Sequence, residues 1–318
     1  MTYFIDKQLK LDFSDEQKTR EESQKLAALF FEKKSMEGEI NIQEFKPDLK
    51  LSEFLAPVFI NWTKPVDAAN LLDSKTISDK RKKIIRQALG QSERLGVKCE
   101  IINPLDLGHF REFLDYYNKN HQEHNYESYL GEDYLIKHDP QRTYLIKVTA
   151  ANGEYLGGRL IHHYAFKLST DQRATERTKQ VKEGYDTICE KMFFELGAQL
   201  GEKHLARGKE FNLRGIAGRK IGLLWNKLKF GYHTRVLPHT PRVYADYGFL
   251  KEVDFDLAFF VSLENVTNIN INNQKFVWNF VLGNNPNWEE IESIREKLKF
   301  PIHIYNREFK LEKEFLPN

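Results

Sequence analysis

The chain has 318 residues and a net charge of +2, from 48 lysines and arginines against 46 aspartates and glutamates. Hydrophobic residues make up 41% and aromatic residues 13%, which allows a sizeable core and excludes a disordered chain. A nearly neutral protein has no global positive field for holding a nucleic acid, so any anion binding has to be local. The length predicts about two domains.

Targeting and metal signals are few. The N-terminal residues do not have the pattern of a secretory signal, and no apolar run approaches the roughly 18 residues that span a bilayer. Cys99 and Cys189 are too few for a four-cysteine zinc site and fit reduced thiols. His121 and His124 lack an evident third ligand, so we expect no metal site. These features together predict a cytoplasmic protein without a transmembrane segment.

Local signals predict the first elements. Ser14 and Gln17 form a capping-box pattern that predicts an early helix. Residues 56–62 are apolar and lie between prolines, which favours a strand. Residues 78–95 predict a helix with an apolar stripe and a basic face, ended by Gly96.

The next segment predicts a strand, a helix and a hairpin. Residues 97–102 favour a strand, and hydrophobic residues at spacings of three and four predict a helix over 106–117. Apolar strands over 144–149 and 155–166 flank the turn pair Asn152–Gly153, which is typical of a β-hairpin.

The middle of the chain alternates between polar and apolar segments. Residues 167–182 are charged and lack periodicity, so we expect a loop there. An apolar stripe predicts a helix over 185–207 that Gly208 closes. A strand over 211–216 and a helix over 221–230 follow.

The last part adds four strands and one helix. The strands are predicted over 242–247, 254–263, 275–282 and 302–305, and the helix over 288–298. Strands that alternate with helices in this way predict an α/β fold with a mixed sheet.

One stretch combines a glycine-ended helix, a strand of the type F-x-x-G, and a helix with a G-L motif, an aromatic residue, a lysine and a terminal F-G. The residues that carry this pattern are Gly208, Phe211, Gly215, Gly222, Leu223, Trp225, Lys227, Phe230 and Gly231. The pattern resembles FemAB-like proteins of the GNAT-like acyltransferase superfamily, although Lys227 stands two residues after the aromatic residue instead of next to it. The basic helix at 78–95 is similar to a helix of the same branch, and the resemblance covers about residues 78–265.

The resemblance implies a GNAT-like mixed sheet flanked by helices, with an N-terminal extension or partial second domain at 1–98 and an acyltransferase domain at 99–318. It implies transfer of an acyl group from acyl-CoA, as co-substrate, to the amine of a small or sugar-linked acceptor, possibly nucleotide-linked. Two alternatives stay open. FemAB enzymes take aminoacyl groups from charged tRNA, and the same scaffold can serve as a catalytically silent interaction module.

The resemblance also places a donor site. The pyrophosphate loop of GNAT proteins has a loose counterpart at Gln180, Lys182, Gly184 and Tyr185. A helix that opens at Gly184 would present free backbone N–H groups and its positive dipole end to the phosphates.

Three residues are candidates for catalysis. His162 and His163 point to opposite faces of the predicted strand, and one could act as a general base, or both could be hydrogen-bonded sheet residues. Lys227 resembles the lysine that FemAB-like enzymes direct toward the reacting groups, where a cation stabilises an oxyanion, and otherwise it is a surface lysine. Asp186 and Glu195 are expected to be solvated or capping carboxylates.

Four residues are candidates for acceptor binding. Arg81 and Arg86 belong to a run with five basic residues within seven positions, which suits phosphate groups or is a solvated face. Tyr126 and Tyr129 lie in a polar aromatic segment that could form an acceptor wall or pack on the surface.

Overall fold

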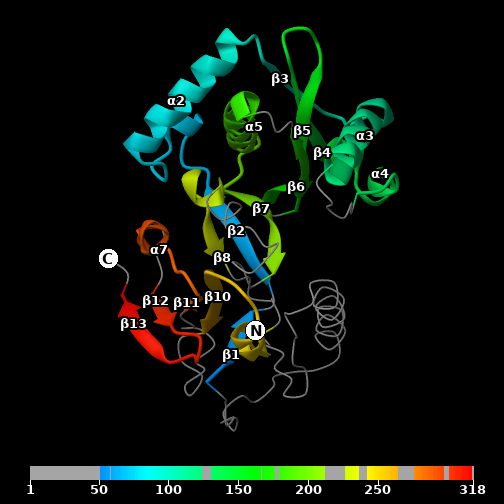
Figure 1. The fold of residues 1–318 in the computed structure, drawn as a ribbon. Coiled ribbons are helices and arrows are strands. Elements are labelled where there is room, and N and C mark those ends of the chain that lie inside the picture. Colours follow the sequence, from blue (N-terminus) through cyan, green and yellow to red (C-terminus); the bar gives the residue numbers. More distant parts are fainter. Residues whose placement is uncertain are drawn as a thin grey trace. The chain divides into compact units, whose positions relative to one another are not determined.

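The computed structural model describes residues 51–57, 59–123, 130–165, 167–175, 179–211, 226–235, 242–263, 276–296 and 301–316 (Figure 1). The chain divides into two compact units that are not continuous in sequence. Unit 1 comprises residues 1–61, 209–228 and 233–318, and unit 2 comprises 62–208 and 229–232. The domain boundary predicted at residue 98 falls within the segment 62–208 of unit 2, at the start of strand β3 (Lys98–Ile102). The early helix predicted from Ser14 lies outside the described residues.

Unit 2 is a mixed sheet with flanking helices, so the predicted fold class is confirmed. Its strand order is β3-β4-β5-β6-β7-β2, with antiparallel pairs from β3 to β6 and a parallel β6–β7 pair. Its elements are η1 (Leu71–Asp73), α2 (Asp79–Arg94), β3 (Lys98–Ile102), α3 (Leu107–Glu123), α4 (Tyr134–Lys137), η2 (Pro140–Arg142), β4 (Thr143–Thr149), β5 (Tyr155–Tyr164), β6 (Lys167–Thr175), α5 (Lys179–Gln199) and most of β2 (Phe59–Pro65) and β7 (His204–Phe211).

The helices cover both faces of this sheet. Helix α3 packs on β5 and β6, whereas α5 packs on β3, β4 and β6 from the other side and carries α2 on its outer surface (Figure 1). Alternation along β5 explains why both faces are filled. Leu160 belongs to the apolar core with α3, and its neighbour Arg159 faces Glu190 on α5.

Several local signals are confirmed at the residues that carried them. The Ser78 side chain accepts a hydrogen bond from the Arg81 backbone N–H at 3.4 Å at the start of α2. Gly96 has a φ of +67° just after that helix, and Gly153 has a φ of +87° in the hairpin turn between β4 and β5. Both positions favour glycine because other residues rarely adopt a positive φ.

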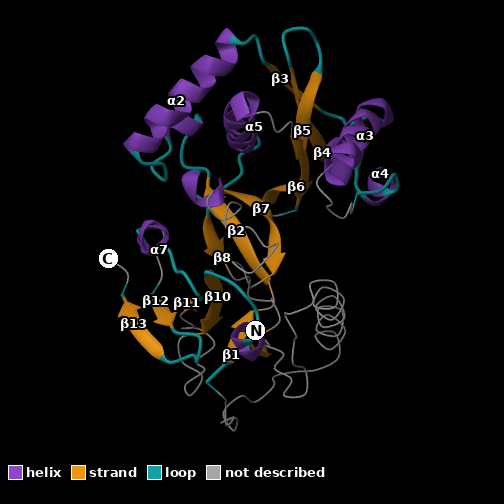
Figure 2. Ribbon diagram, in the orientation of Figure 1, coloured by secondary structure: helices purple, strands orange, loops and turns teal. Residues whose placement is uncertain are grey.

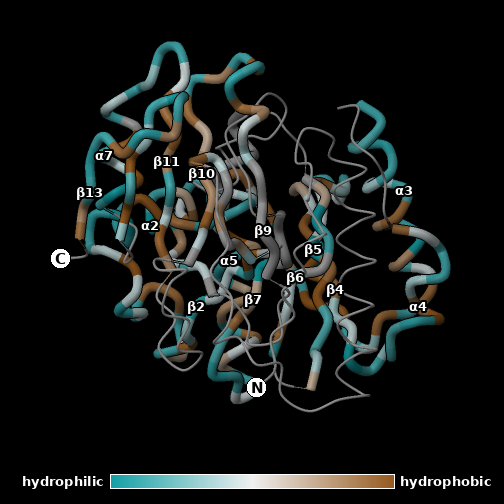
Figure 3. Tube along the Cα trace, turned by 90° about the horizontal axis from the view of Figure 1, so that it is seen from below, coloured by the Kyte–Doolittle hydropathy of each residue, from teal (hydrophilic) through white to brown (hydrophobic). Residues whose placement is uncertain are grey.

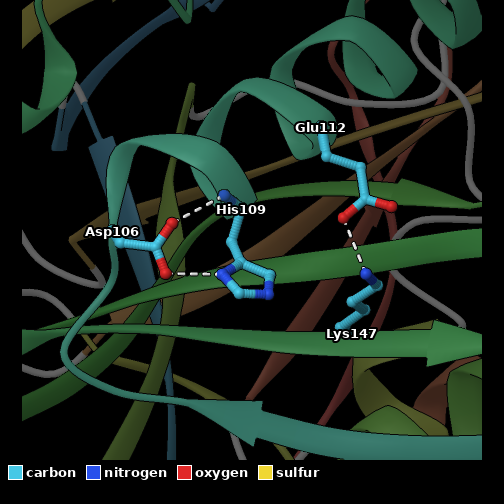
Figure 4. Close-up of polar contacts among 4 residues, drawn as sticks. All are labelled: Asp106, His109, Glu112 and Lys147. Carbon is cyan, nitrogen blue, oxygen red and sulfur yellow. Dashed lines mark hydrogen bonds and ion pairs between the residues drawn. The ribbon is translucent and has the colours of Figure 1, made fainter.

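Polar contacts fix the start of α3 (Figure 4). The Asp106 carboxylate accepts a hydrogen bond from the His109 backbone N–H at 2.9 Å and lies 2.6 Å from His109 Nδ1. One turn later, Lys147 on β4 donates to Glu112 at 2.7 Å. An acidic side chain at this position satisfies a free N–H group of the first helical turn.

The loop predicted over 167–182 is wrong, because the structure has strand β6 and the first turn of α5 there. Strand β6 is polar, yet Ser169 and Thr170 are only 4% and 8% exposed. It lies between β5 and β7, which supply its hydrogen bonds and its burial. Strand preference depends on such neighbours, and a single sequence does not display them.

The helix predicted over 185–207 is shifted and shortened. Helix α5 spans Lys179–Gln199, and Gly201, with a φ of +71°, follows its end. The predicted stop, Gly208, lies inside β7. In the sequence, the spacing of Leu205 continues the apolar stripe of the helix. In the structure, Leu205 is a fully buried residue of β7.

Unit 1 contains a two-stranded β1–β9 sheet and a sheet of order β10-β11-β12-β13, with α7 beside the latter (Figure 2). Strands β10 and β11 are hydrophobic over most of their length (Figure 3). The strands predicted over 242–247, 254–263, 275–282 and 302–305 and the helix predicted over 288–298 are confirmed to within a few residues, whereas β8 and β13 were not predicted. The strand predicted over 211–216 lies mostly outside the described residues. The elements are β1 (Glu53–Pro57), β8 (His233–Arg235), β9 (Arg242–Asp246), η3 (Gly248–Lys251), β10 (Leu257–Leu263), β11 (Phe276–Leu282), α7 (Trp288–Arg295), β12 (Ile302–Tyr305) and β13 (Leu311–Phe315).

Candidate functional site

Strands β6 and β7 run parallel, are joined by α5, and pair over a short distance. Among the described residues their register contains two pairs, Leu168–Leu205 and Ser169–Ala206, although both strands continue. The next residue of β6, Thr170, is 8% exposed, and its hydroxyl has no hydrogen-bond partner in the described part of the chain. Where the strands part, their backbone edges are suited to hydrogen-bonding an extended ligand.

A group of buried charged and polar residues lies between this part of the sheet and α5. We call it the Glu190 cluster, and its members are Lys64, Arg159, Glu190, Arg207 and Tyr232. Arg159 Nη1 donates to Glu190 Oε2 at 2.9 Å, and Arg207 Nη1 lies 3.8 Å from the same oxygen. The five residues are between 0 and 7% exposed, so the cluster is shielded from bulk water.

Several donors of the cluster are not satisfied by hydrogen bonds. Within the described residues, Lys64 Nζ and the Nε and Nη2 atoms of Arg159 have no hydrogen-bond partner. The Lys64 ammonium lies over the Phe194 ring, 4.6 Å from its centroid, and 5.8 Å from that of Tyr232. A cation–π contact compensates part of the lost hydration, but unpaired buried donors still carry a cost.

The acid–base property of Lys64 follows from this position. Burial lowers its pKa from 10.5 to about 8, although the carboxylates of Glu190 and Asp67 oppose the shift. The ammonium is therefore protonated at pH 7 but gives up its proton readily. A lysine in this range is suited to proton transfer at neutral pH.

The two carboxylates of this region behave differently. Burial alone would raise the pKa of Glu190, but Arg207, Arg159 and Lys64 together hold it below its usual value. The pKa of Asp186, whose Oδ1 atom lies 3.6 Å from Arg173 Nη1, is lowered against its burial in the same way. Both groups stay ionised and hold the surrounding cations in place.

Among the described residues of this region, cations outnumber carboxylates. Lys64, Arg159, Arg173 and Arg207 act on Glu190 or Asp186, so the buried charge is positive on balance. Removing such charges from water is costly unless a negative group compensates them. The arrangement is therefore suited to stabilising an anion or a developing oxyanion.

The predicted histidines have different partners. His162 Nδ1 lies 3.0 Å from Thr143 Oγ1, and its ring packs on those of His138 and Tyr164. Burial and the nearby His138 lower the pKa of His162 to about 4, so it is neutral at pH 7 and a weak base. His163 Nε2 lies 2.5 Å from Glu202 Oε1. The two residues do not form one site.

The residues of the predicted donor site lie in the first two turns of α5. The helix begins at Lys179, so the opening predicted at Gly184 is corrected. Gly184 serves the contact with α2, because a Cβ there would come within 2.2 Å of Ser92 Oγ. The Tyr185 hydroxyl donates to the Ala174 carbonyl at 2.8 Å. Gln180 and Lys182 belong to the first turns of the helix, and their side chains lie outside the described part.

The other predicted residues fall in three environments. Residues 226–229 are helical, and Lys227, in unit 1, is 7% exposed and therefore not a surface lysine. Arg81 is half-buried with its guanidinium over an aromatic ring, whereas Arg86 is exposed. Tyr126 and Tyr129 lie outside the described residues.

The Glu190 cluster was missed by the sequence reasoning. Arg159 follows two glycines and precedes two apolar residues in β5, and Lys64 is the next-to-last residue of β2. A charged residue that alternation places on a buried face is the signal that could have found Arg159. Asp186, interpreted as solvated or capping, is 5% exposed.

Among the described residues, no three or more His, Cys, Asp or Glu side chains are grouped to hold a metal ion. In the same part of the chain, no helix has the length and apolar character to cross a membrane.

No protein-family model and no curated protein matches this chain. Solved structures that it resembles include FemX, with a TM-score of 0.44 and 13% identity over 60% of this chain and 62% of that one. L-PGS from Bacillus licheniformis matches with a TM-score of 0.35 and 16% identity, over 56% of this chain and 54% of that one. A GCN5-related N-acetyltransferase from Sphaerobacter thermophilus matches with a TM-score of 0.33 and 12% identity, over 57% of this chain and 50% of that one. The chain thus spans 50 to 62% of the length of these structures. The likeness is one of fold alone.

Proposed function

We propose that this chain is an N-acyltransferase that moves an acyl group from acyl-CoA to the amine of a small or sugar-linked acceptor. The observation that carries the proposal is the parting of β6 and β7 after Ser169 and Ala206. Two strand edges at this point can hydrogen-bond the amide groups of an extended donor arm. Such binding would align the thioester carbonyl for attack by the amine.

The Glu190 cluster supports this chemistry. Arg207 directly follows Ala206, the last residue of β7 in its register with β6. As the amine attacks, negative charge develops on the carbonyl oxygen, the carbon–sulfur bond breaks, and the amine loses a proton. Buried arginines stabilise the developing charge, and Lys64 is proposed to accept the proton in its neutral form, which the lowered pKa makes accessible near neutral pH.

The residues predicted from the sequence enter as further proposals. The first turns of α5, with Gln180 and Lys182, are proposed for the pyrophosphate of CoA, because a helix N-terminus attracts phosphate. His163 is the better candidate base of the two histidines, since the pKa of His162 is about 4. Lys227 is proposed to stabilise the oxyanion.

A second candidate is a transferase that takes its acyl group from aminoacyl-tRNA. Helix α2 favours it, because Lys80, Lys83, Arg86 and Arg94 are exposed on this one helix. A row of exposed cations neutralises the phosphates of a nucleic acid, and the resulting affinity falls steeply with salt.

Binding and transfer assays distinguish the candidates. The purified chain would be titrated with CoA and with aminoacyl-tRNA, and then incubated with labelled acetyl-CoA or labelled aminoacyl-tRNA and a set of amines. CoA binding together with label transfer from acetyl-CoA supports the first candidate. Binding of tRNA that Arg86→Gln weakens, without CoA binding, supports the second. No binding and no transfer would refute both and leave an interaction module.

A further inference from the structure

The segment from Lys229 to Tyr232 belongs to unit 2, while the residues on either side of it belong to unit 1. Gly231 in this segment has a φ of +80°, and a Cβ there would lie 2.8 Å from the Thr76 carbonyl oxygen. Only glycine fits this turn without strain. The segment is therefore held closely against the residues before α2.

The Phe230 ring in this segment carries two cations. Arg81 Cζ lies 5.4 Å from the ring centroid, and Lys229 Nζ lies 5.0 Å from it. Phe230 is fully buried, whereas both cations are half-buried. Cation–π contacts hold two like charges at one place near the surface. Burial lowers the pKa of Lys229, and the positive charge of Arg81 lowers it further.

Lys229 also interacts with charged residues other than Arg81. Lys229 interacts electrostatically with Asp186, and with Arg173 and Arg207 as well as Arg81. The Arg173 side chain is 31% exposed, and Arg207 is 7% exposed. The cations that act on Lys229 thus include half-buried and buried residues, and Arg173, Lys229 and Arg207 all act on the Asp186 carboxylate.

We propose that Arg81, Arg173 and Lys229 bind a phosphoryl group of the substrate, with Arg207 at the inner end of the site. Guanidinium groups bind phosphate oxygens in pairs, and an ammonium adds a compact charge. Within the ranges that the structure describes, Asp186 and Glu190 are fewer than the cations around them, so a phosphate dianion would relieve repulsion between these cations. The phosphoryl site itself does not depend on the proposed function. The identity of the molecule that carries the phosphate does rest on it, since CoA and a nucleotide-linked acceptor both contain phosphate.

Calorimetric titration with pyrophosphate at low salt tests the site without any transfer reaction. Lys229→Met and Arg81→Met each remove one charge and keep most of the side-chain length, and each should weaken binding by about tenfold or more. Lys229→Arg, which keeps the charge, should retain binding. The matched control is Lys98→Met, because Lys98 is an exposed lysine of β3 in the same unit. Unchanged binding in the first two variants, or an equal loss in the control, would overturn the proposal.

A chemical readout covers the case in which a variant folds poorly. In the unaltered protein, pyrophosphate should protect Lys229 from reductive methylation and leave Lys98 reactive, and equal reactivity with and without pyrophosphate refutes the site. Titrations with CoA and with UDP then identify the carrier by the tighter binding. A protein that binds pyrophosphate through Lys229 but transfers no acyl group would refute the proposed function and leave this inference intact.

Discussion

Replacing Lys64 with methionine should stabilise the protein at neutral pH. The substitution keeps a long apolar side chain on the Phe194 ring and removes a buried ammonium that lacks a hydrogen-bond partner among the described residues. The Lys64 pKa is 10.5 in the unfolded reference and about 8 in the folded protein. This difference corresponds to roughly 3 kcal/mol of unfolding free energy, and it already includes the attraction of Glu190 and Asp67 for the Lys64 ammonium.

The sign of the pH dependence follows from these two values. Below pH 8, Lys64 is protonated in both states, and the folded state bears the full cost of burying the charge. Between pH 8 and 10.5 the unfolded chain keeps a proton that the folded protein releases, so this cost disappears as the pH rises. The advantage of Lys64→Met should therefore be largest at pH 7 and absent near pH 10.5.

Urea unfolding at pH 6, 7, 8, 9 and 10, followed by tryptophan fluorescence, measures this difference between the variant and the unaltered protein. Lys203→Met is the matched control, because Lys203 is exposed in the same unit. It should change the unfolding free energy little at any of these pH values. A loss of stability in Lys64→Met at pH 7, or a gain that is the same at pH 7 and pH 10, would show that the Lys64 ammonium is well compensated in the folded protein.

Three further predictions concern the same unit. Glu190→Gln leaves buried arginines without their carboxylate and should lower the unfolding free energy by about 3 kcal/mol or more in urea titrations, whereas Glu112→Gln in a more exposed pair should cost about 1 kcal/mol or less. Gly184→Ala should lower the melting temperature through its clash with Ser92 Oγ at 2.2 Å, a loss of about 1–3 kcal/mol, and Ser92→Ala in the same chain should restore it. Because the pKa of His162 is lowered to about 4, stability should fall between pH 6.5 and 4 by on the order of 1 kcal/mol, and His162→Asn should abolish that part of the pH dependence in thermal melts.

Much of the fold could be predicted because its signals are local. The helix at 78–95 has a cap at Ser78 and a stop at Gly96, and both have the expected geometry in the structure. The hairpin depends on the Asn152–Gly153 turn and on apolar strands on either side, which are all neighbours in sequence. Elements of this kind need no knowledge of distant partners.

The failures occur where distant partners decide the structure. Strand β6 has a polar sequence, and its neighbours β5 and β7 make it a strand. Leu205 fits the periodicity of α5, but the chain turns after Gly201 and places it in β7. Arg159 and Glu190 are 31 residues apart, so no local pattern indicates that they form a pair. Sheet register and tertiary burial override local preference in each case.

These failures also coincide with the candidate site. The two parallel strands that part here are β6, whose polar sequence predicted a loop, and β7, whose start was predicted too late. The buried charges lie at the same place. Sequences usually agree with their fold at every level except where function requires otherwise. A packed apolar core between β5 and α5 would avoid the desolvation of Lys64, Arg159 and Arg207, and it would be at least as stable. Stability alone therefore does not explain these cations, whereas the proposed binding of an anion or a developing oxyanion would.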